Sequence, residues 1–136
     1  MFTQTKVLTH QGALKMLGAA AKRAEAIGQP QCIVIVDARG QVAAELVMTG
    51  AKFLSRKSAL AKALTASSIG ARSDTIPEAV RPAIGAAAKG DVTGLPGGLP
   101  IIVDGVVLGG IGVGSGSGEQ DVEVAEAALA SIGAIG

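Results

Sequence analysis

The sequence has very few aromatic side chains and no clustered charge, and these absences exclude several kinds of protein. Among 136 residues there is no tryptophan or tyrosine, and the only two phenylalanines are Phe2 and Phe53. Stacking platforms for single-stranded nucleic acid are therefore missing. The net charge is only +1 and no basic run is present. Nucleic acid is consequently not expected as a main partner.

Cysteine and histidine are equally scarce, with one residue of each kind. Cys32 cannot form a disulfide within the chain, and its place in an apolar run predicts a small buried side chain. His10 alone excludes metal sites built from several histidines. We expect it to be an exposed residue in a first helical turn. The alternative is an axial ligand for haem or another metal centre.

Long apolar runs are also missing. None approaches the roughly 20 residues that cross a bilayer, and the first twelve residues lack the apolar core of a signal peptide. No membrane association is expected, and the cytoplasm is the expected compartment. At 136 residues, the chain is expected to form one domain, residues 1–136, with a core of its own.

What remains is a clear alternation of helical and strand patterns. Leu14, Leu17 and Ala24 recur at helical spacing in the first segment and are expected on its apolar face. The apolar run 32–36 favours a strand that is covered on both faces. Asp104-Gly105 is typical of a two-residue hairpin turn. The expected elements, in order, are a helix over 9–28, a hairpin over 32–48, a helix over 55–70, short helical turns over 75–88, a hairpin over 101–108 and a helix capped by residue 117.

Glycine is concentrated in the second hairpin and in the loop that follows it. Gly110 and Gly112 belong to a repeated series that suggests direct packing on the strand backbone, by a helix or by a ligand. The loop 114–118 resembles a phosphate cradle only superficially, because neither nucleotide-binding glycine spacing is present. Glu119 and Asp121 would also repel a phosphate at the start of the last helix.

These two carboxylates are the best acid/base candidates in the chain. If burial raised the pKa of Glu119 or Asp121, that residue could transfer a proton. The alternative is purely structural, because acidic residues in a first helical turn stabilise a helix without any catalytic role.

Arg56 and Lys57 stand in the first turn of the second helix, where the helix dipole disfavours cations. Either both side chains extend into water, or an anionic ligand or an acidic neighbour lies near this helix start. By spacing, Lys62 falls on another face of the helix, and a solvated position is expected for it.

Five motifs occur in an order that resembles the GlcG/HbpS-like family. They are D-x-x-G at 37–40, A-x-x-K-A-x-T-A at 59–66, P-G-G-x-P-I at 96–101, G-x-x-x-G-x-I-G-V at 105–113 and G-E-Q-D-x-x-x-A at 118–125. That family is often described as haem-binding or haem-degrading, and it includes the C-terminal domain of one type of cobalamin adenosyltransferase. The resemblance implies an α/β (α+β), profilin-like sandwich, an antiparallel sheet of about five strands with helices on both faces. It also implies a homo-oligomer.

The reaction is less well defined than the family. The first hypothesis is a small enzyme that acts on a small anionic, carboxylate-type metabolite, with Glu119 or Asp121 handling protons and a cation of the second helix holding the carboxylate. The second is a haem or tetrapyrrole module, in which Arg56, Lys57 and Lys62 meet the propionates. The third is a non-catalytic accessory subunit.

Two loops are expected to contribute ligand contacts under the first two hypotheses. They contain Gly97 and Gly98 before the second hairpin, and Ser115 and Gly116 after it. The cofactor remains undetermined from the sequence, with haem possible and His10 as its only candidate histidine ligand.

Overall fold

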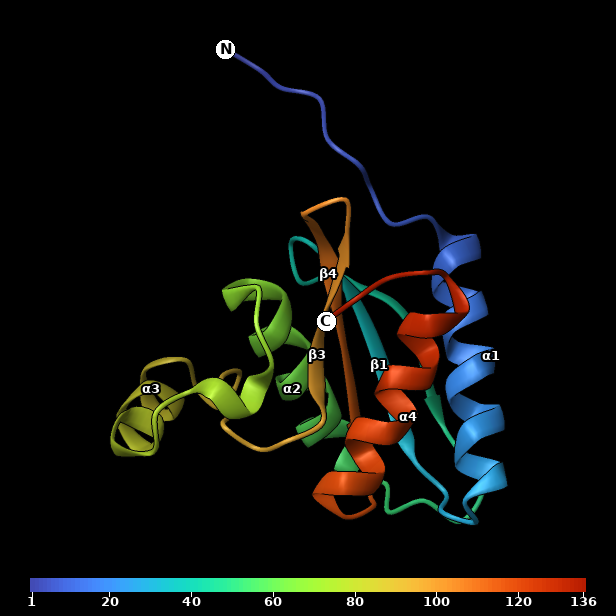
Figure 1. Ribbon diagram of the computed structural model, residues 1–136. Helices are drawn as coiled ribbons and strands as arrows, with labels where there is room; N and C mark the ends of the chain where they lie inside the picture. The colour runs from blue at the N-terminus through green and yellow to red at the C-terminus, as the bar shows by residue number, and fades with distance from the viewer.

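The computed structural model describes residues 1–136 as one antiparallel sheet with helices on both faces (Figure 1). The strands are β1 (Cys32–Asp37), β2 (Val42–Val47), β3 (Gly98–Val103) and β4 (Val106–Gly114), in the order β2-β1-β4-β3. The helices are α1 (His10–Ala26), α2 (Ser55–Ile69), α3 (Arg81–Ala87) and α4 (Gly118–Ser131). Two 3₁₀ turns, η1 (Ser73–Thr75) and η2 (Glu78–Val80), lie between α2 and α3. No helix is long and apolar enough to span a bilayer.

Strand β1 is covered on both faces, as its continuous apolar run predicts. Ile33 and Ile35 belong to the larger core, which α1 and α4 close on one face of the sheet. Cys32, Val34 and Val36 face the other way and pack against α2. The two antiparallel neighbours of β1, β2 and β4, complete its backbone hydrogen bonds.

The glycines of β4 are explained by helix α2. A Cβ atom on Gly112 would collide with the Ala59 carbonyl oxygen, and one on Gly110 would collide with that of Ala63. Helix α2 therefore lies directly on the strand backbone. The sequence left open whether a helix or a ligand packs on this strand, and the structure shows the helix.

The strand count differs from the expectation of about five. Four strands are present, and the C-terminal segment adds only a single bridge, between Ile102 and Ile135. The hairpin between β3 and β4 is as predicted. Asp104 and Gly105 both have positive φ, at 50° and 74°, which a type I′ turn requires.

Helix α1 begins after Thr9, whose side chain accepts a hydrogen bond from the Gly12 amide. Its buried face is rotated from the predicted one. Ala24 is buried as expected, but Leu14 is 59% exposed and Met16 is fully buried instead. Small residues on this face allow α1 to lie close to α4.

The segment between α2 and β3 forms short helical turns, as predicted for residues 75–88. Its helix begins only at Arg81, with Pro82 in the first turn, after two 3₁₀ turns. Proline is well suited to a first helical turn, because the backbone N–H that it lacks has no partner there. No residue of α3 is buried, and the helix lies to one side of the sandwich (Figure 1).

Candidate functional site

A buried ion pair joins α2 to α4. The Lys62 Nζ atom lies 3.1 Å from Oδ2 of Asp121, and the two side chains are 5% and 4% exposed. The same ammonium donates to the Val113 carbonyl oxygen at 2.7 Å. The prediction of a solvated Lys62 is therefore wrong, because helical spacing cannot show that a loop from the other end of the chain covers that face.

Local structure sets the position of Asp121. Ser117 and Gln120 form a capping box, in which the Gln120 amide donates to the Ser117 hydroxyl and the Ser117 amide donates to the Gln120 side chain. This cap orients the first turn of α4. The other carboxylate oxygen of Asp121, Oδ1, accepts from the Gly116 amide at 3.1 Å. Both oxygens of the carboxylate therefore have a partner.

Burial raises the pKa of Asp121 above the ordinary value for an aspartate. The positive charge and hydrogen bond of Lys62, the Gly116 amide and the Gln31 side chain oppose this effect and favour the ionised form. A carboxyl group held between such opposed influences, within reach of a fixed cation, is well suited to accept or release a proton.

The ion pair forms one wall of a small polar pocket. The pocket has a volume of about 280 Å³ and lies between the start of α2, the loop 114–118 and the segment before β3. Only one of its lining residues is hydrophobic. The full lining is Lys52, Ser55, Ser58, Lys62, Leu95, Pro96, Ser115, Gly116, Gly118 and Asp121.

The backbone at Ser115 is unusual. Its φ of 92° is in a region that non-glycine residues rarely adopt. Two contacts hold it there: the Ser115 hydroxyl accepts from the Lys52 amide at 2.9 Å, and its carbonyl oxygen accepts from the Gln29 side chain at 3.1 Å. Strained backbone that is held by its surroundings is concentrated at binding sites.

The two candidate acids are not together. Asp121 is buried in the pocket wall, whereas Glu119 is exposed. Glu119 lies in a different, outer cleft that also contains Asp74, Glu123 and Glu126. Two residues along a helix correspond to about 200° of rotation, which explains the separation.

One of the two cations at the start of α2, Arg56, has an acidic neighbour. The guanidinium of Arg56 forms two hydrogen bonds with the Glu45 carboxylate of β2, at 2.8 and 3.0 Å. This contact, and the hydrogen bond above all, raises the pKa of Arg56. Lys57 is exposed. Neither Arg56 nor Lys57 lines the pocket beside Asp121.

Of the two loops that were predicted to contact a ligand, only the one after the second hairpin contributes its predicted residues to the pocket lining. Ser115 and Gly116 line the pocket, as just described. Gly97 lies behind it, where a Cβ atom would come within 3.2 Å of Lys62 Nζ. Gly98 is buried beside the Lys62 carbonyl and Ser73, so helix α2 rather than open space adjoins it.

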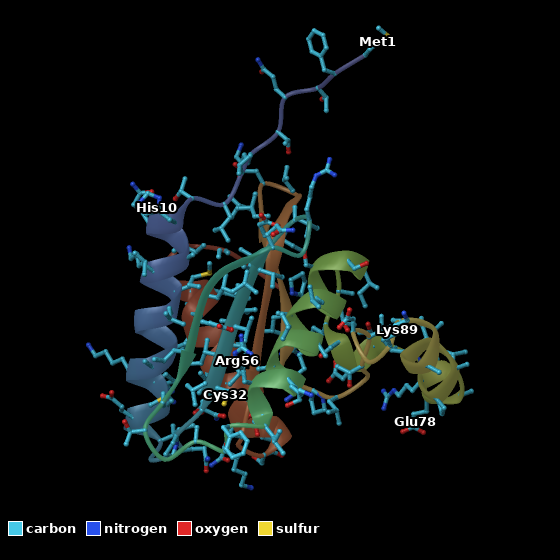
Figure 2. All side chains as sticks on the ribbon, turned by 180° about the vertical axis from the view of Figure 1, so that it is seen from behind. Met1, His10, Cys32, Arg56, Glu78 and Lys89 are labelled. Carbon is cyan, nitrogen blue, oxygen red and sulfur yellow. The ribbon has the colours of Figure 1, made fainter.

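His10 is exposed at the start of α1. Figure 2 shows it at the opposite end of the fold from Cys32 and Arg56. Cys32 is fully buried, as predicted, and burial is the main cause that raises the pKa of its thiol. Its Sγ atom lies 3.4 Å from the Lys52 carbonyl oxygen.

Sequence reasoning missed Gln31, Lys52, Ser55 and Ser58. The three pocket residues among them are common surface types, and only the return of the loop 114–118 to α2 brings them together. Gln31 carried a signal that could have been noticed, because it is a polar residue immediately before a continuous apolar strand.

Comparison with known proteins identifies the family. The family model described as "Haem degrading protein HbpS-like" matches residues 8–130. The chain is 36% identical over 132 residues to the corrinoid adenosyltransferase PduO of Citrobacter freundii, covering 92% of this chain but only 39% of that protein. It therefore spans well under half the length of this relative.

Two solved structures agree with the fold. Klebsiella pneumoniae protein ORFY has a TM-score of 0.92 and 28% identity, over 99% of this chain and 97% of that one. The PduOC:heme complex has a TM-score of 0.88 and 29% identity, over 96% of this chain and 98% of that one. The family match across nearly the whole chain, together with these likenesses, shows that the protein belongs to the HbpS-like family.

Proposed function

We propose that the protein binds a small carboxylate in the pocket beside Lys62 and Asp121 and exchanges a proton with it through Asp121. The observation that carries this proposal is the buried Lys62–Asp121 pair in the wall of a small polar pocket. A buried ion pair is weak support for stability by itself, because the loss of hydration offsets much of the attraction. A buried ion pair in the wall of a pocket is also placed to bind a ligand and to exchange a proton with it.

The size and lining of the pocket select the ligand class. Drug-sized ligands occupy about 300–1,000 Å³, so a pocket of about 280 Å³ favours a molecule of few non-hydrogen atoms. Its lining contains two lysines and three serines, and ammonium and hydroxyl groups are suitable partners for a carboxylate. Lys62 would attract the anionic oxygen, and Asp121 would take or return a proton on a nearby carbon, which is the carbon beyond the carbonyl in a 2-oxo acid and the hydroxyl-bearing carbon in a 2-hydroxy acid.

Proton exchange with solvent provides the test. Pyruvate and lactate serve as probes, representing a 2-oxo and a 2-hydroxy acid. In D₂O, ¹H NMR follows the replacement of the proton next to the carbonyl or hydroxyl group by deuterium. We expect the wild type to accelerate exchange in at least one probe. General acid–base catalysis contributes about 10²–10⁴-fold, so Asp121→Asn is expected to lose at least ~100-fold.

Glu119→Gln is the matched control, because Glu119 lies in the same helical turn but outside the pocket. It is expected to retain the wild-type rate. Exchange that survives Asp121→Asn would contradict the assignment of Asp121. Absence of exchange and of binding with both probes would contradict the proposal and favour the non-catalytic accessory subunit.

Haem binding is a second candidate, favoured by the likeness to the PduOC:heme complex. The residues of this chain do not form a suitable haem site within a single chain. Met48 lines a pocket of about 550 Å³ between the end of α1 and β2, but no lysine or arginine lines that pocket to meet the propionates. The pocket with Lys52 and Lys62 contains no histidine, cysteine or methionine, and His10 lies at the far end of the fold.

Absorbance titration tests this second candidate. The protein has no tryptophan or tyrosine, so a bound tetrapyrrole would dominate its spectrum. We expect the Soret band of added haemin to keep the position of free haemin. A saturable Soret shift at equimolar haemin would establish haem binding. It would also show that an assembly of several chains brings together the axial ligand and the propionate-binding cations that no single pocket of one chain combines.

A further inference from the structure

We infer that Gln31 is a third polar member of this site, a positioning residue that holds the Asp121 carboxylate through its side-chain amide. The inference rests on the proposed role of Asp121, and it adds a residue that lines no part of the pocket. Gln31 immediately precedes β1, so its place is determined by the central strand of the sheet.

The burial of Gln31 is unusual for its chemistry. The side chain is 0% exposed, and neither its amide nitrogen nor its amide oxygen has a hydrogen-bond partner. Buried polar groups are almost always paired, and an unpaired one is costly. A leucine of similar size would fill this space without that cost. The amide therefore requires an explanation other than packing.

The surroundings of Gly116 show what the amide is near. A Cβ atom on Gly116 would lie 2.8 Å from Gln31 Nε2, 2.9 Å from Gln120 Oε1 and 3.0 Å from Asp121 Oδ1. The amide donor and the two acceptor oxygens thus lie around the same point beside Gly116, in the space that a side chain at this position would enter. The terminal torsion of a glutamine is broad, so the amide of Gln31 is free to turn toward Oδ1.

A hydrogen bond from Gln31 would complete the environment of Asp121. Oδ2 already faces Lys62, and Oδ1 accepts only the Gly116 amide. A second donor on Oδ1 would fix the plane of the carboxylate and favour its ionised form.

Other groups also act on Asp121 from the elements packed around it. Lys62 faces it from α2, and Lys52 lines the same pocket from the loop before α2. Cys32 of β1 is close enough for Asp121 to raise the pKa of its thiol. Any test must therefore leave these three residues unchanged.

The test measures the titration of Asp121 directly. Aspartate carboxyl carbons labelled with ¹³C are followed by NMR as the pH is varied, in the wild type and in Gln31→Leu, and the Asp121 signal is assigned through Asp121→Asn. We expect the Asp121 midpoint to move to higher pH in Gln31→Leu, because a donor to the ionised form is lost. Gln31→Met serves the same purpose if the leucine variant fails to fold.

Gln29→Leu is the matched control, because Gln29 anchors the same loop through the Ser115 carbonyl. Its Asp121 midpoint is expected to stay at the wild-type value. An unchanged midpoint in Gln31→Leu, or an equal shift in Gln29→Leu, would overturn the inference. Because the readout is a titration, a shift without proton exchange in the wild type would sustain the role of Gln31 while refuting the proposed function.

Discussion

Breaking the Lys62–Asp121 pair from one side should be far more damaging than removing both charges. The two charged atoms are 3.1 Å apart, and the side chains are at most 5% exposed. With an effective dielectric constant of about 20, their attraction is about 5 kcal/mol. The loss of hydration on burial offsets much of this attraction. A single substitution removes the attraction but leaves the other charge buried without its partner.

The perturbations are Lys62→Met, Asp121→Asn and the double variant. We expect each single substitution to lower the free energy of unfolding by about 3–5 kcal/mol at pH 7. The double variant should be no less stable than the milder single variant, because neither charge is then left alone. Urea denaturation followed by circular dichroism is the assay, since the chain has no tryptophan for fluorescence.

Two results would refute this reasoning. One is a cost below about 1 kcal/mol for either single substitution, which is the range of exposed ion pairs. The other is additivity of the two single effects within about 0.5 kcal/mol, which would show that the groups are not coupled. The slope m must stay constant across the four proteins for the comparison to hold.

Two further predictions concern glycine and cysteine. Gly112→Ala should be strongly destabilising, because its Cβ would meet the Ala59 carbonyl oxygen. Gly18 lies in open space within α1, so Gly18→Ala should raise the free energy of unfolding by up to about 1 kcal/mol. Thermal denaturation measures both variants, and equal effects would contradict this contrast. Cys32, which is fully buried and has a raised thiol pKa, should react with a thiol reagent only after denaturation, so rapid labelling of the native protein would disprove its burial.

The sequence predicted local features well where a few neighbouring residues decide them. Thr9 and Ser117 cap their helices as expected, and Asp104-Gly105 forms the expected turn. These features depend on hydrogen bonds and backbone angles within a few residues. The buried face of α1 was predicted less well, because the packing of α4 rather than helical spacing selects Met16 over Leu14.

The candidate site was only half predictable. Asp121 was singled out for its acidity, but Glu119 was equally eligible from the sequence, and only the rotation of α4 against the sheet separates them. Lys62 was assigned to solvent by its spacing, and only its motif connected it with the family. Gln31 and the serines of the pocket were not found at all.

By itself, the sequence determined the family, the order of the elements, the apolar strand covered on both faces and the glycine-lined strand beside it. Periodicity, caps and turn residues carry that information, because each acts over a short stretch of chain. The tertiary structure alone decided that Lys62 meets Asp121 across 59 positions of sequence, and that Gln31 lies beside them. Such contacts depend on how β4 lies beneath α2 and on where the loop 114–118 returns. No local pattern encodes that geometry.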